Sequence, residues 1–248
     1  MKHVALLDGD LYLHTAAAAV QRIMPFDEDG DMIGPYCRLS EAKDAFMEAV
    51  EHDLKHLTVS KTLLCLSAPT NFRYSIYPSY KSNRKNTPKP FGFIELREWA
   101  KEQFEVRQVD DMEADDVLGI IATKAPAAVI FSRDKDMLTL PAKLWREGKL
   151  IQVTEADANL NWMRQALTGD ATDGYPGCPG YGPKKADTLL EGLAGAPLPD
   201  LWKAVVGAYE KADLTAADAL TQARVARVLR AEDWNTKTKR MTLWQPPA

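Results

Sequence analysis

The sequence predicts an α/β fold with a central, mainly parallel β-sheet flanked by helices. Short apolar runs, of the length of buried strands, are present at residues 3–8, 62–67, 104–109, 127–132 and 150–154. Longer segments in which apolar residues recur at helical spacing lie between them, for example 40–57 and 93–103. Strands that alternate with helices are typical of a parallel sheet, because each parallel strand needs a crossover connection.

The pattern changes near residue 158. The remainder of the chain has helical spacing interrupted by Gly and Pro, which predicts helices at residues 160–167, 184–190, 198–211 and 216–230. We therefore expect an α/β core in residues 1–157 and a helical subdomain in residues 158–248. The chain has 248 residues, 46% of them hydrophobic, and this is enough apolar material for both parts.

The composition excludes several classes of protein. No apolar run is long enough to span a bilayer, so we expect no membrane partner. Cys37, Cys65 and Cys178 are scattered and contain no CxxC motif, which argues against a disulfide framework or a zinc site. Unpaired cysteines are typical of a reducing cytoplasm, and we predict that location.

Acidic residues gather in four clusters, and three of them follow predicted strands. Asp8 and Asp10 follow the first strand, five of the seven residues in 110–116 are acidic and follow the third, and Asp134 and Asp136 follow the fourth. The last cluster lies in "TGDATDG" (168–174). Taken alone, 110–116 is equally consistent with the acidic first turn of a helix. Together the clusters favour one shared pocket, since functional groups gather beyond the carboxyl ends of parallel strands.

A pocket that collects these carboxylates needs positive counter-charge. The residues concerned are Asp8, Asp10, Glu113, Asp115, Asp116, Asp134, Asp136, Asp170 and Asp173. Hard divalent cations prefer such oxygen ligands, so the sequence predicts Mg²⁺ or Mn²⁺. Two such ions would suit phosphoryl chemistry, in which one activates water and the other stabilises the leaving oxygen.

Two further segments are suited to phosphate. Residues 71–93 carry five basic side chains and no acidic one, with aromatic residues between them, although the whole chain has a net charge of −4. Such a segment can neutralise phosphates and stack on bases, and the alternative is a solvated surface loop. In "GCPGYGPKKA" (177–186), a glycine-rich turn precedes a helix that begins with Pro183, Lys184 and Lys185. This favours backbone phosphate binding over an ordinary helical corner.

The order of the motifs resembles the flap endonuclease and 5′→3′ exonuclease superfamily. The motifs are "LLDGD", "YKSNRK", "MEADDVLG", "SRDKDM" and "GDATDGYPGCPGYGPKKA". The short bacteriophage-type exonucleases are the most similar members, because "ARVLRAEDWN" and "TLWQP" also match that group. The resemblance implies a PIN-like core with a basic arch or gateway at about 71–104. It also implies a helix–three-turn–helix element at about 160–192 in a DNA-binding subdomain.

The same resemblance implies a metal-dependent 5′→3′ exonuclease. We expect it to act on duplex DNA with 5′ ends or flaps, and on RNA primers in RNA–DNA hybrids, in phage-type DNA replication. The location would then be the host cell cytoplasm, and a monomer is favoured.

The resemblance also assigns roles to single residues. Asp8, Glu113 and Asp115 match one metal group, and Asp134, Asp136, Asp170 and Asp173 match the other, with Asp116 beside both. Lys81 and Arg84 match residues that contact the scissile phosphate and act in catalysis with Asp8, Asp115 and Asp134. Tyr80 matches an aromatic residue that stacks on the terminal base, with Lys85 as a further DNA contact. The remaining matches grip the duplex, often through a bound K⁺: Gly180, Gly182, Lys184 and Lys185.

One departure from the family concerns the second core strand. The family has a carboxylate shortly after it, whereas this chain has Ser67 and Ala68 in "LLCLSAPTNFR". Asp10 is the nearest replacement in sequence, as a direct ligand or through a metal-bound water. The alternative is that Asp10 caps the helix that begins near Leu11.

Other functions account for fewer of these features. "LLDGD" and "GDATD" also match a haloacid-dehalogenase-type phosphatase, but that class requires neither the "MEADD" helix nor "YKSNR". A DNA-binding protein with a weakened nuclease site is suggested only by Ala68. A PIN-like ribonuclease that acts on RNA alone remains an alternative, and "GCPGYGPKKA" favours duplex DNA over it.

Overall fold

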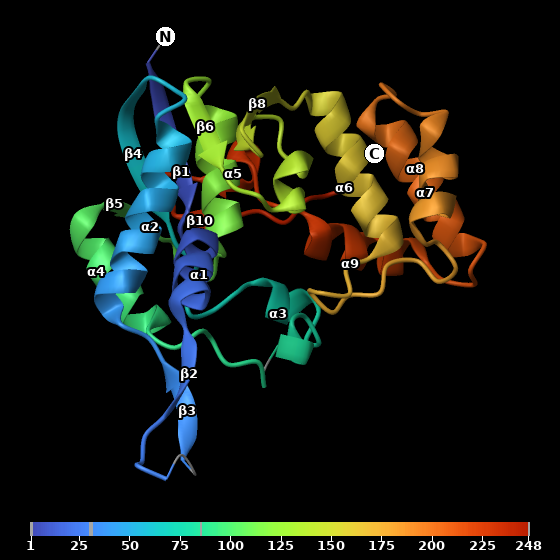
Figure 1. Cartoon of the computed structure of the whole chain (residues 1–248). Helices are drawn as coiled ribbons and strands as arrows, with labels where there is room; N and C mark the ends of the chain where they lie inside the picture. The colour runs from blue at the N-terminus through green and yellow to red at the C-terminus, as the bar shows by residue number, and fades with distance from the viewer. Residues whose placement is uncertain (1, 30–31, 85, 248) are drawn as a thin grey trace.

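The computed structural model describes residues 2–29, 32–84 and 86–247, and a six-stranded sheet lies at its centre (Figure 1). The strand order is β5-β4-β1-β6-β7-β8, and all neighbouring pairs are parallel except β7 and β8. The strands are β1 (His3–Asp8), β4 (Val59–Cys65), β5 (Glu105–Arg107), β6 (Ala128–Phe131), β7 (Lys143–Arg146) and β8 (Lys149–Gln152). The predicted α/β fold class is therefore confirmed.

Helices cover both faces of this sheet. α1 (Gly9–Val20), α2 (Leu39–Leu54) and α4 (Phe93–Gln103) share one apolar cluster with Ala5 and Leu7 of β1. α5 (Ala114–Lys124) shares a second cluster with Leu6, the β1 residue between them. Successive side chains of a strand point to opposite faces, so β1 is buried on both sides, as expected for a central parallel strand.

Among the strands that the sequence prediction missed are β7 and the hairpin of β2 (Arg22–Pro25) and β3 (Ile33–Tyr36), which projects from the lower end of the molecule (Figure 1). Each hairpin strand contains a proline. Because proline cannot donate a backbone hydrogen bond to a neighbouring strand, its presence argues against predicting a central strand. Ile23 and Ile33 are 64% and 67% exposed, so these apolar side chains do not form a buried face that would mark the segment as core strands.

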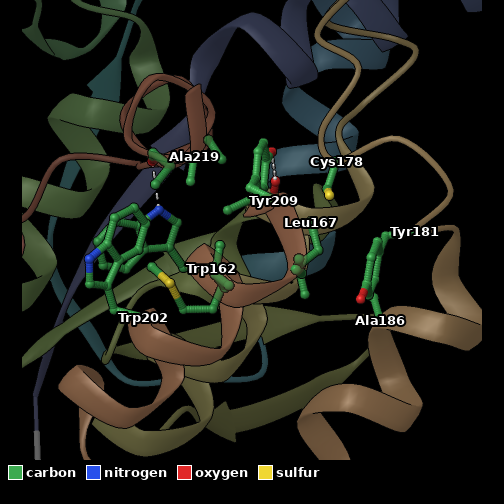
Figure 2. Close-up of a cluster of buried hydrophobic side chains, with 14 of the residues drawn as sticks. Trp162, Leu167, Cys178, Tyr181, Ala186, Trp202, Tyr209 and Ala219 are labelled. Carbon is green, nitrogen blue, oxygen red and sulfur yellow. Dashed lines mark hydrogen bonds between the residues drawn. The ribbon is translucent and has the colours of Figure 1, made fainter. Parts of the chain in front are cut away.

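Four helices pack together in the C-terminal part of the chain. They are α6 (Glu155–Thr168), α7 (Pro183–Glu191), α8 (Leu198–Glu210) and α9 (Ala216–Ala226). Figure 2 shows their core, in which the Trp162 indole N–H donates to the carbonyl of Ala223 at 2.8 Å and the Tyr209 hydroxyl donates to the carbonyl of Ala166 at 2.7 Å. In the described part of the chain, no helix is both long and apolar enough to cross a membrane.

The chain returns to the α/β core after α9. The predicted helix to residue 230 is wrong at its end, because α9 stops at Ala226. Val228 and Leu229 instead join the apolar cluster of α5 and β1. The 3₁₀ helix Ala231–Asp233 and the strand pair of β9 (Trp234–Asn235) and β10 (Arg240–Met241) follow α9 in the chain. Another 3₁₀ helix, Lys135–Thr139, follows β6.

This return depends on a glycine in α5. A Cβ at Gly119 would lie 2.2 Å from the carbonyl oxygen of Leu229, which is backbone and cannot rotate away. Gly119→Ala should therefore lower the free energy of unfolding by about 1–3 kcal/mol, the usual cost of overpacking.

Gly207→Ala in α8 is the matched control, because a Cβ there meets no atom within 4 Å. It should raise the free energy of unfolding by about 0.4–1 kcal/mol, since alanine restricts the unfolded chain more than glycine does. Urea unfolding of both variants measures the difference, and equal effects would contradict the packing argument.

Candidate active site

A pocket of about 870 Å³ lies beyond the carboxyl ends of β1, β4 and β6, and we call it the acidic pocket. It brings together eight of the nine carboxylates selected from the sequence: Asp8, Asp10, Glu113, Asp115, Asp134, Asp136, Asp170 and Asp173. Lys81 and Arg84 line the same pocket. Segments that are more than 160 residues apart in the chain therefore meet at one edge of the sheet.

Local hydrogen bonds fix the first of these carboxylates. Asp8 ends β1 and caps α1, since its Oδ1 accepts from the backbone N–H of Leu11 at 3.2 Å. Its Oδ2 accepts from the hydroxyl of Ser132 at 2.7 Å. Asp134 caps the 3₁₀ helix that follows β6, where the N–H of Asp136 donates to it at 2.9 Å. Strand exits and helix starts thus coincide at the pocket, which is why acidic residues suit these positions.

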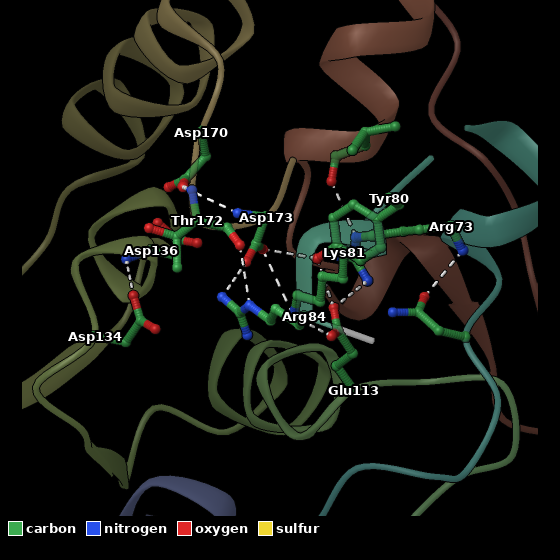
Figure 3. Close-up of polar contacts among 12 residues, drawn as sticks. Arg73, Tyr80, Lys81, Arg84, Glu113, Asp134, Asp136, Asp170, Thr172 and Asp173 are labelled. Atoms are coloured by element: carbon green, nitrogen blue, oxygen red, sulfur yellow. Dashed lines mark hydrogen bonds and ion pairs between the residues drawn. The ribbon is translucent and has the colours of Figure 1, made fainter. Parts of the chain in front are cut away.

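One half of the acidic pocket is neutralised by basic side chains, as Figure 3 shows. Glu113 pairs with Lys81, and the guanidinium of Arg73 lies 3.3 Å from it. Asp173 pairs with Arg84 at 2.5 Å and lies 3.6 Å from the Lys81 ammonium. Burial alone would raise the pKa of Glu113, but the positive charges of Arg73 and Lys81 outweigh it and lower the pKa to about 2.

The other half of the acidic pocket is short of positive charge. Burial, with Asp10 and Asp134 nearby, raises the pKa of Asp8 to about 6. Burial, with Asp134 and Asp173 nearby, raises the pKa of Asp136 to about 7. The pKa of Asp115 is also raised well above its ordinary value by burial and by the charges of Asp8, Asp134 and Glu113. These carboxylates would be stabilised by a cation.

The chemistry of these side chains fits a hard divalent cation. The converging groups offer carboxylate oxygens, which such cations prefer as ligands. The side chains do not form a ready cage. Within residues 2–29, 32–84 and 86–247, no group of three His, Cys, Asp or Glu is placed to hold a metal ion. An ion would therefore be held either through bridging waters, several of which Mg²⁺ usually keeps, or after the carboxylates move closer together.

Asp116 differs from the other eight carboxylates, because its side chain is fully buried outside the acidic pocket. Its two oxygens accept from Arg73 at 2.7 and 2.8 Å, and one of them also accepts from the N–H of Leu229 at 3.1 Å. A metal-ligand role for Asp116 would require its oxygens to leave Arg73, and that role stays a prediction. Arg73 in α3 (Arg73–Ile76) uses its other N–H groups on the carbonyls of Val225 and Arg227.

Tyr80 also has a different place from the one predicted. Only 3% of it is exposed, and its ring lies 6.4 Å from that of Tyr175 between centroids. Its hydroxyl is within hydrogen-bonding distance of Glu113 at 2.9 Å and Asp173 at 2.8 Å. Stacking of Tyr80 on a terminal base would require its ring to become exposed, and that role stays a prediction. Tyr74 lines the acidic pocket and is 47% exposed, so its ring is the accessible one.

Asp10 points to the end of β4. Asp8, and not Asp10, caps α1, so the capping alternative for Asp10 is wrong. Asp10 lies in the first turn of α1, and its Oδ2 accepts from the backbone N–H of Ser67 at 2.9 Å. Ser67 lines the acidic pocket, whereas Ala68 does not. The β4 exit thus presents a backbone N–H to Asp10 at the place where the resemblance leads us to expect a carboxylate.

The glycine-rich turn between α6 and α7 places two lysines on the surface. Gly182 is the N-cap of α7, and Lys184 and Lys185 are exposed in its first turn. Gly180 has a φ of 76°, which favours glycine, and the Lys185 ammonium lies 4.1 Å above the ring of Tyr181. Lys85, the remaining predicted DNA contact, lies outside the described residues.

Sequence reasoning missed several basic residues of the acidic pocket. Arg133, Lys135 and Arg146 line it together with His14 and Lys89. Lys135 pairs with Asp170 at 2.6 Å. The signal for Arg133 and Lys135 was present in "SRDKD", where both basic residues alternate with predicted ligands.

Comparison with known proteins connects this geometry to nucleases. Residues 3–163 match the family described as the 5′-3′ exonuclease N-terminal resolvase-like domain. The chain is 28% identical to an exodeoxyribonuclease of Enterobacteria phage T3, over 99% of this chain and 93% of that protein. It is 29% identical to the flap endonuclease Xni of Shewanella amazonensis, over 77% of each chain. The T5 D15 protein co-crystallised with metal ions has a similar fold, with a TM-score of 0.62 and 16% identity over 90% of this chain and 88% of that one.

The raised pKa values of Asp8 and Asp136 predict an unusual pH dependence of stability. Between the ordinary carboxyl pKa of 3.8 and values of about 6 and 7, the folded chain holds protons that the unfolded chain has lost. The free energy of unfolding should therefore rise as the pH falls from about 8 to about 5 in the presence of EDTA. Urea unfolding at several pH values measures this slope.

Asp136→Asn is the control for that measurement, because it removes one of the titrating groups and keeps the side-chain shape. The slope should become smaller in this variant. A free energy of unfolding that is constant or falls over the same pH range in the unsubstituted chain would contradict the assignment.

Proposed function

Because this chain belongs to the 5′-3′ exonuclease family and is a hydrolase of DNA phosphodiester bonds, we propose that it removes nucleotides from the 5′ ends of duplex DNA in a metal-dependent reaction. The proposal includes cleavage of 5′ flaps and of RNA primers in RNA–DNA hybrids, in phage-type DNA replication. The observation that carries it is the convergence of eight carboxylates with Lys81 and Arg84 in the acidic pocket.

The residues of the acidic pocket divide into two candidate ligand groups. Asp8, Glu113 and Asp115 would hold one divalent cation, and Asp134, Asp136, Asp170 and Asp173 would hold the other. When bound, such a pair of Mg²⁺ or Mn²⁺ ions supplies an activated water and charge stabilisation of the leaving oxygen. Asp116 is not part of either group, because Arg73 and two backbone N–H groups already occupy its oxygens.

We propose that Lys81 contacts the phosphate. Its backbone has a φ of 52°, an uncommon conformation for a residue with a side chain, and its N–H donates to the carbonyl of Asp173 at 2.7 Å. Its ammonium is held by Glu113 and lies near Asp173. A phosphodiester that enters the pocket can replace these carboxylates as the partner of Lys81. The positive charge would then stabilise the charge that develops on the phosphate.

The helical part of the chain would hold the duplex. We propose that residues 158–248 form a DNA-binding subdomain and residues 1–157 a nuclease core with an arch or gateway at about 71–104. Lys184 and Lys185 are exposed at the N-terminus of α7, where backbone N–H groups also favour phosphate. A K⁺ ion at the turn that contains Gly180 and Gly182 would add to this grip.

A comparison of substrates tests the reaction. A 5′-labelled duplex, a 5′ flap, an RNA–DNA hybrid and a single strand are each incubated with Mg²⁺ and with EDTA. We expect cleavage from the 5′ end of the duplex and of the flap, with 5′-phosphorylated products, and no cleavage in EDTA. Activity that persists in EDTA would reject the metal-dependent mechanism, and cleavage of RNA alone would indicate a ribonuclease.

Lys81 and Lys184 should separate catalysis from binding. Lys81→Ala should lower kcat by about 10²–10³-fold, the usual effect of removing one group that stabilises transition-state charge, with little change in duplex affinity. Lys184→Ala should weaken binding and reduce the salt dependence of the affinity by about one unit of slope. Single-turnover cleavage measures the catalytic effect, and duplex binding at several salt concentrations measures the effect on affinity. The reverse pattern would contradict the roles proposed for Lys81 and Lys184.

The contact between Asp10 and Ser67 predicts a charge role for Asp10. Asp10→Asn can keep the hydrogen bond to the Ser67 N–H and removes only the negative charge. It should raise the Mg²⁺ concentration needed for half-maximal cleavage, and addition of Ser67→Asp should partly restore it. A Mg²⁺ titration of the single and double variants on one duplex would reject the role if Asp10→Asn left the metal dependence unchanged.

A further inference from the structure

A second pocket of about 490 Å³ adjoins the acidic pocket and has no part in the function proposed above. It lies between α1, α2 and the β7–β8 turn, and we call it the α1–α2 pocket. Leu11 and Arg133 line both pockets, so the two pockets are neighbours that share these residues. A substrate held in the acidic pocket would therefore lie beside the α1–α2 pocket.

Small residues on the facing sides of two helices create this space. Ala16 and Ala19 of α1 lie opposite Ala45 and Ala49 of α2, and Trp145 of β7 contributes an aromatic ring that is 7% exposed. Alanine side chains end at Cβ, so the helices leave a gap that a flat apolar group can fill. The volume is within the range of about 300–1,000 Å³ that is usual for small-molecule sites.

Polar groups stand at one edge of the same pocket. The carboxylate of Asp53 accepts a hydrogen bond from the Tyr12 hydroxyl and is only 15% exposed. His52 is 63% exposed beside it, with Nδ1 at 3.5 Å from the other oxygen of Asp53. An occupant with apolar faces and hydrogen-bonding edges matches this lining better than a purely apolar one.

Arg133 supplies positive charge where the two pockets meet. It is exposed and lies between Ser132, whose hydroxyl binds Asp8, and Asp134. A ligand that extends from one pocket to the other would place an anionic group at Arg133 and its flat part among the alanines. Nucleotides have this combination of a phosphate and a planar base with polar edges.

We propose that the α1–α2 pocket binds one nucleotide unit, with the base between α1 and α2 and the phosphate at Arg133. The proposal rests on the nuclease function, because that function brings DNA to the acidic pocket. The unit has two possible sources with the same chemistry. It is either the 5′-terminal residue of the substrate strand or a released 5′-mononucleotide.

Binding of deoxyadenosine 5′-monophosphate and of deoxyadenosine to the full chain in EDTA tests the pocket without catalysis. Both should bind. Arg133→Gln should lower the affinity for the monophosphate by about tenfold, because one charge-assisted contact is lost, and should leave the affinity for the nucleoside unchanged. Ala19→Phe should prevent binding of both, because the ring fills the pocket. Ala18→Phe on the same helix is the matched control, since Ala18 is exposed and does not line the pocket.

Cleavage of a 5′-labelled duplex with Mg²⁺ distinguishes the two sources. If the substrate residue occupies the pocket, Ala19→Phe should raise KM, and a duplex with an abasic 5′-terminal residue should be insensitive to the substitution. If the released mononucleotide occupies it, Ala19→Phe should leave KM unchanged and remove product inhibition. Either result supports the pocket.

Two results would overturn the proposal. One is the absence of nucleotide and nucleoside binding to the unsubstituted chain, and the other is binding that Ala19→Phe does not affect. Because the binding experiment needs no metal and no cleavage, a chain that binds nucleotides but cuts no DNA would reject the nuclease function alone. A chain that cuts DNA but binds no nucleotide would reject only the pocket.

Discussion

The buried ion pair between Arg73 and Asp116 is the interaction on which the site depends. It connects α3, α5 and the segment after α9, because Arg73 also binds the carbonyls of Val225 and Arg227 while Asp116 accepts from the N–H of Leu229. The Arg73 side chain is 3% exposed and that of Asp116 is fully buried. Loss of one partner would leave an uncompensated buried charge, a change that costs about 3–5 kcal/mol in comparable proteins. The pair therefore anchors the loop that carries Lys81 against the helix that carries Glu113.

This anchor also explains the uneven charge balance of the acidic pocket. Arg73 and Lys81 share Glu113, so the side of the pocket next to α3 is neutral or positive. Asp8 and Asp115, on the side of β1, have no basic partner among the contacts that the structure describes, and burial with mutual repulsion raises the pKa of both. Under the proposed function, a phosphodiester would be drawn to the first side and a divalent cation to the second. The arrangement would then hold apart the two charges that phosphoryl transfer brings together.

Much of the fold was predictable from the sequence, because the core strands are continuous apolar runs and the acidic residues follow them directly. β7 and the β2–β3 hairpin were not predictable in this way, since "KLWR" mixes basic and apolar residues and both hairpin strands contain proline. The convergence of the carboxylates followed from the parallel order of the strands. The separate role of Asp116 did not, because its partner Arg73 is 43 residues away and looks like any other basic residue of the loop. The burial of Tyr80 is hidden from the sequence for the same reason: only the tertiary contacts with Tyr175 and Glu113 show it.

The β4 exit lacks a carboxylate of its own but is joined to one in α1. Ser67 occupies the pocket wall after β4, and its hydroxyl accepts from the N–H of Ala114 at 2.9 Å, so this residue helps to begin α5. Its own N–H donates to Asp10, whose place in the first turn of α1 suits a carboxylate because the unpaired N–H groups there favour negative charge. A carboxylate in α1 thereby reaches the end of β4 from the neighbouring element. Asp10 thus adds to the negative charges of Asp115 and Asp134 near Asp8, and Ser67 holds it there through its backbone N–H.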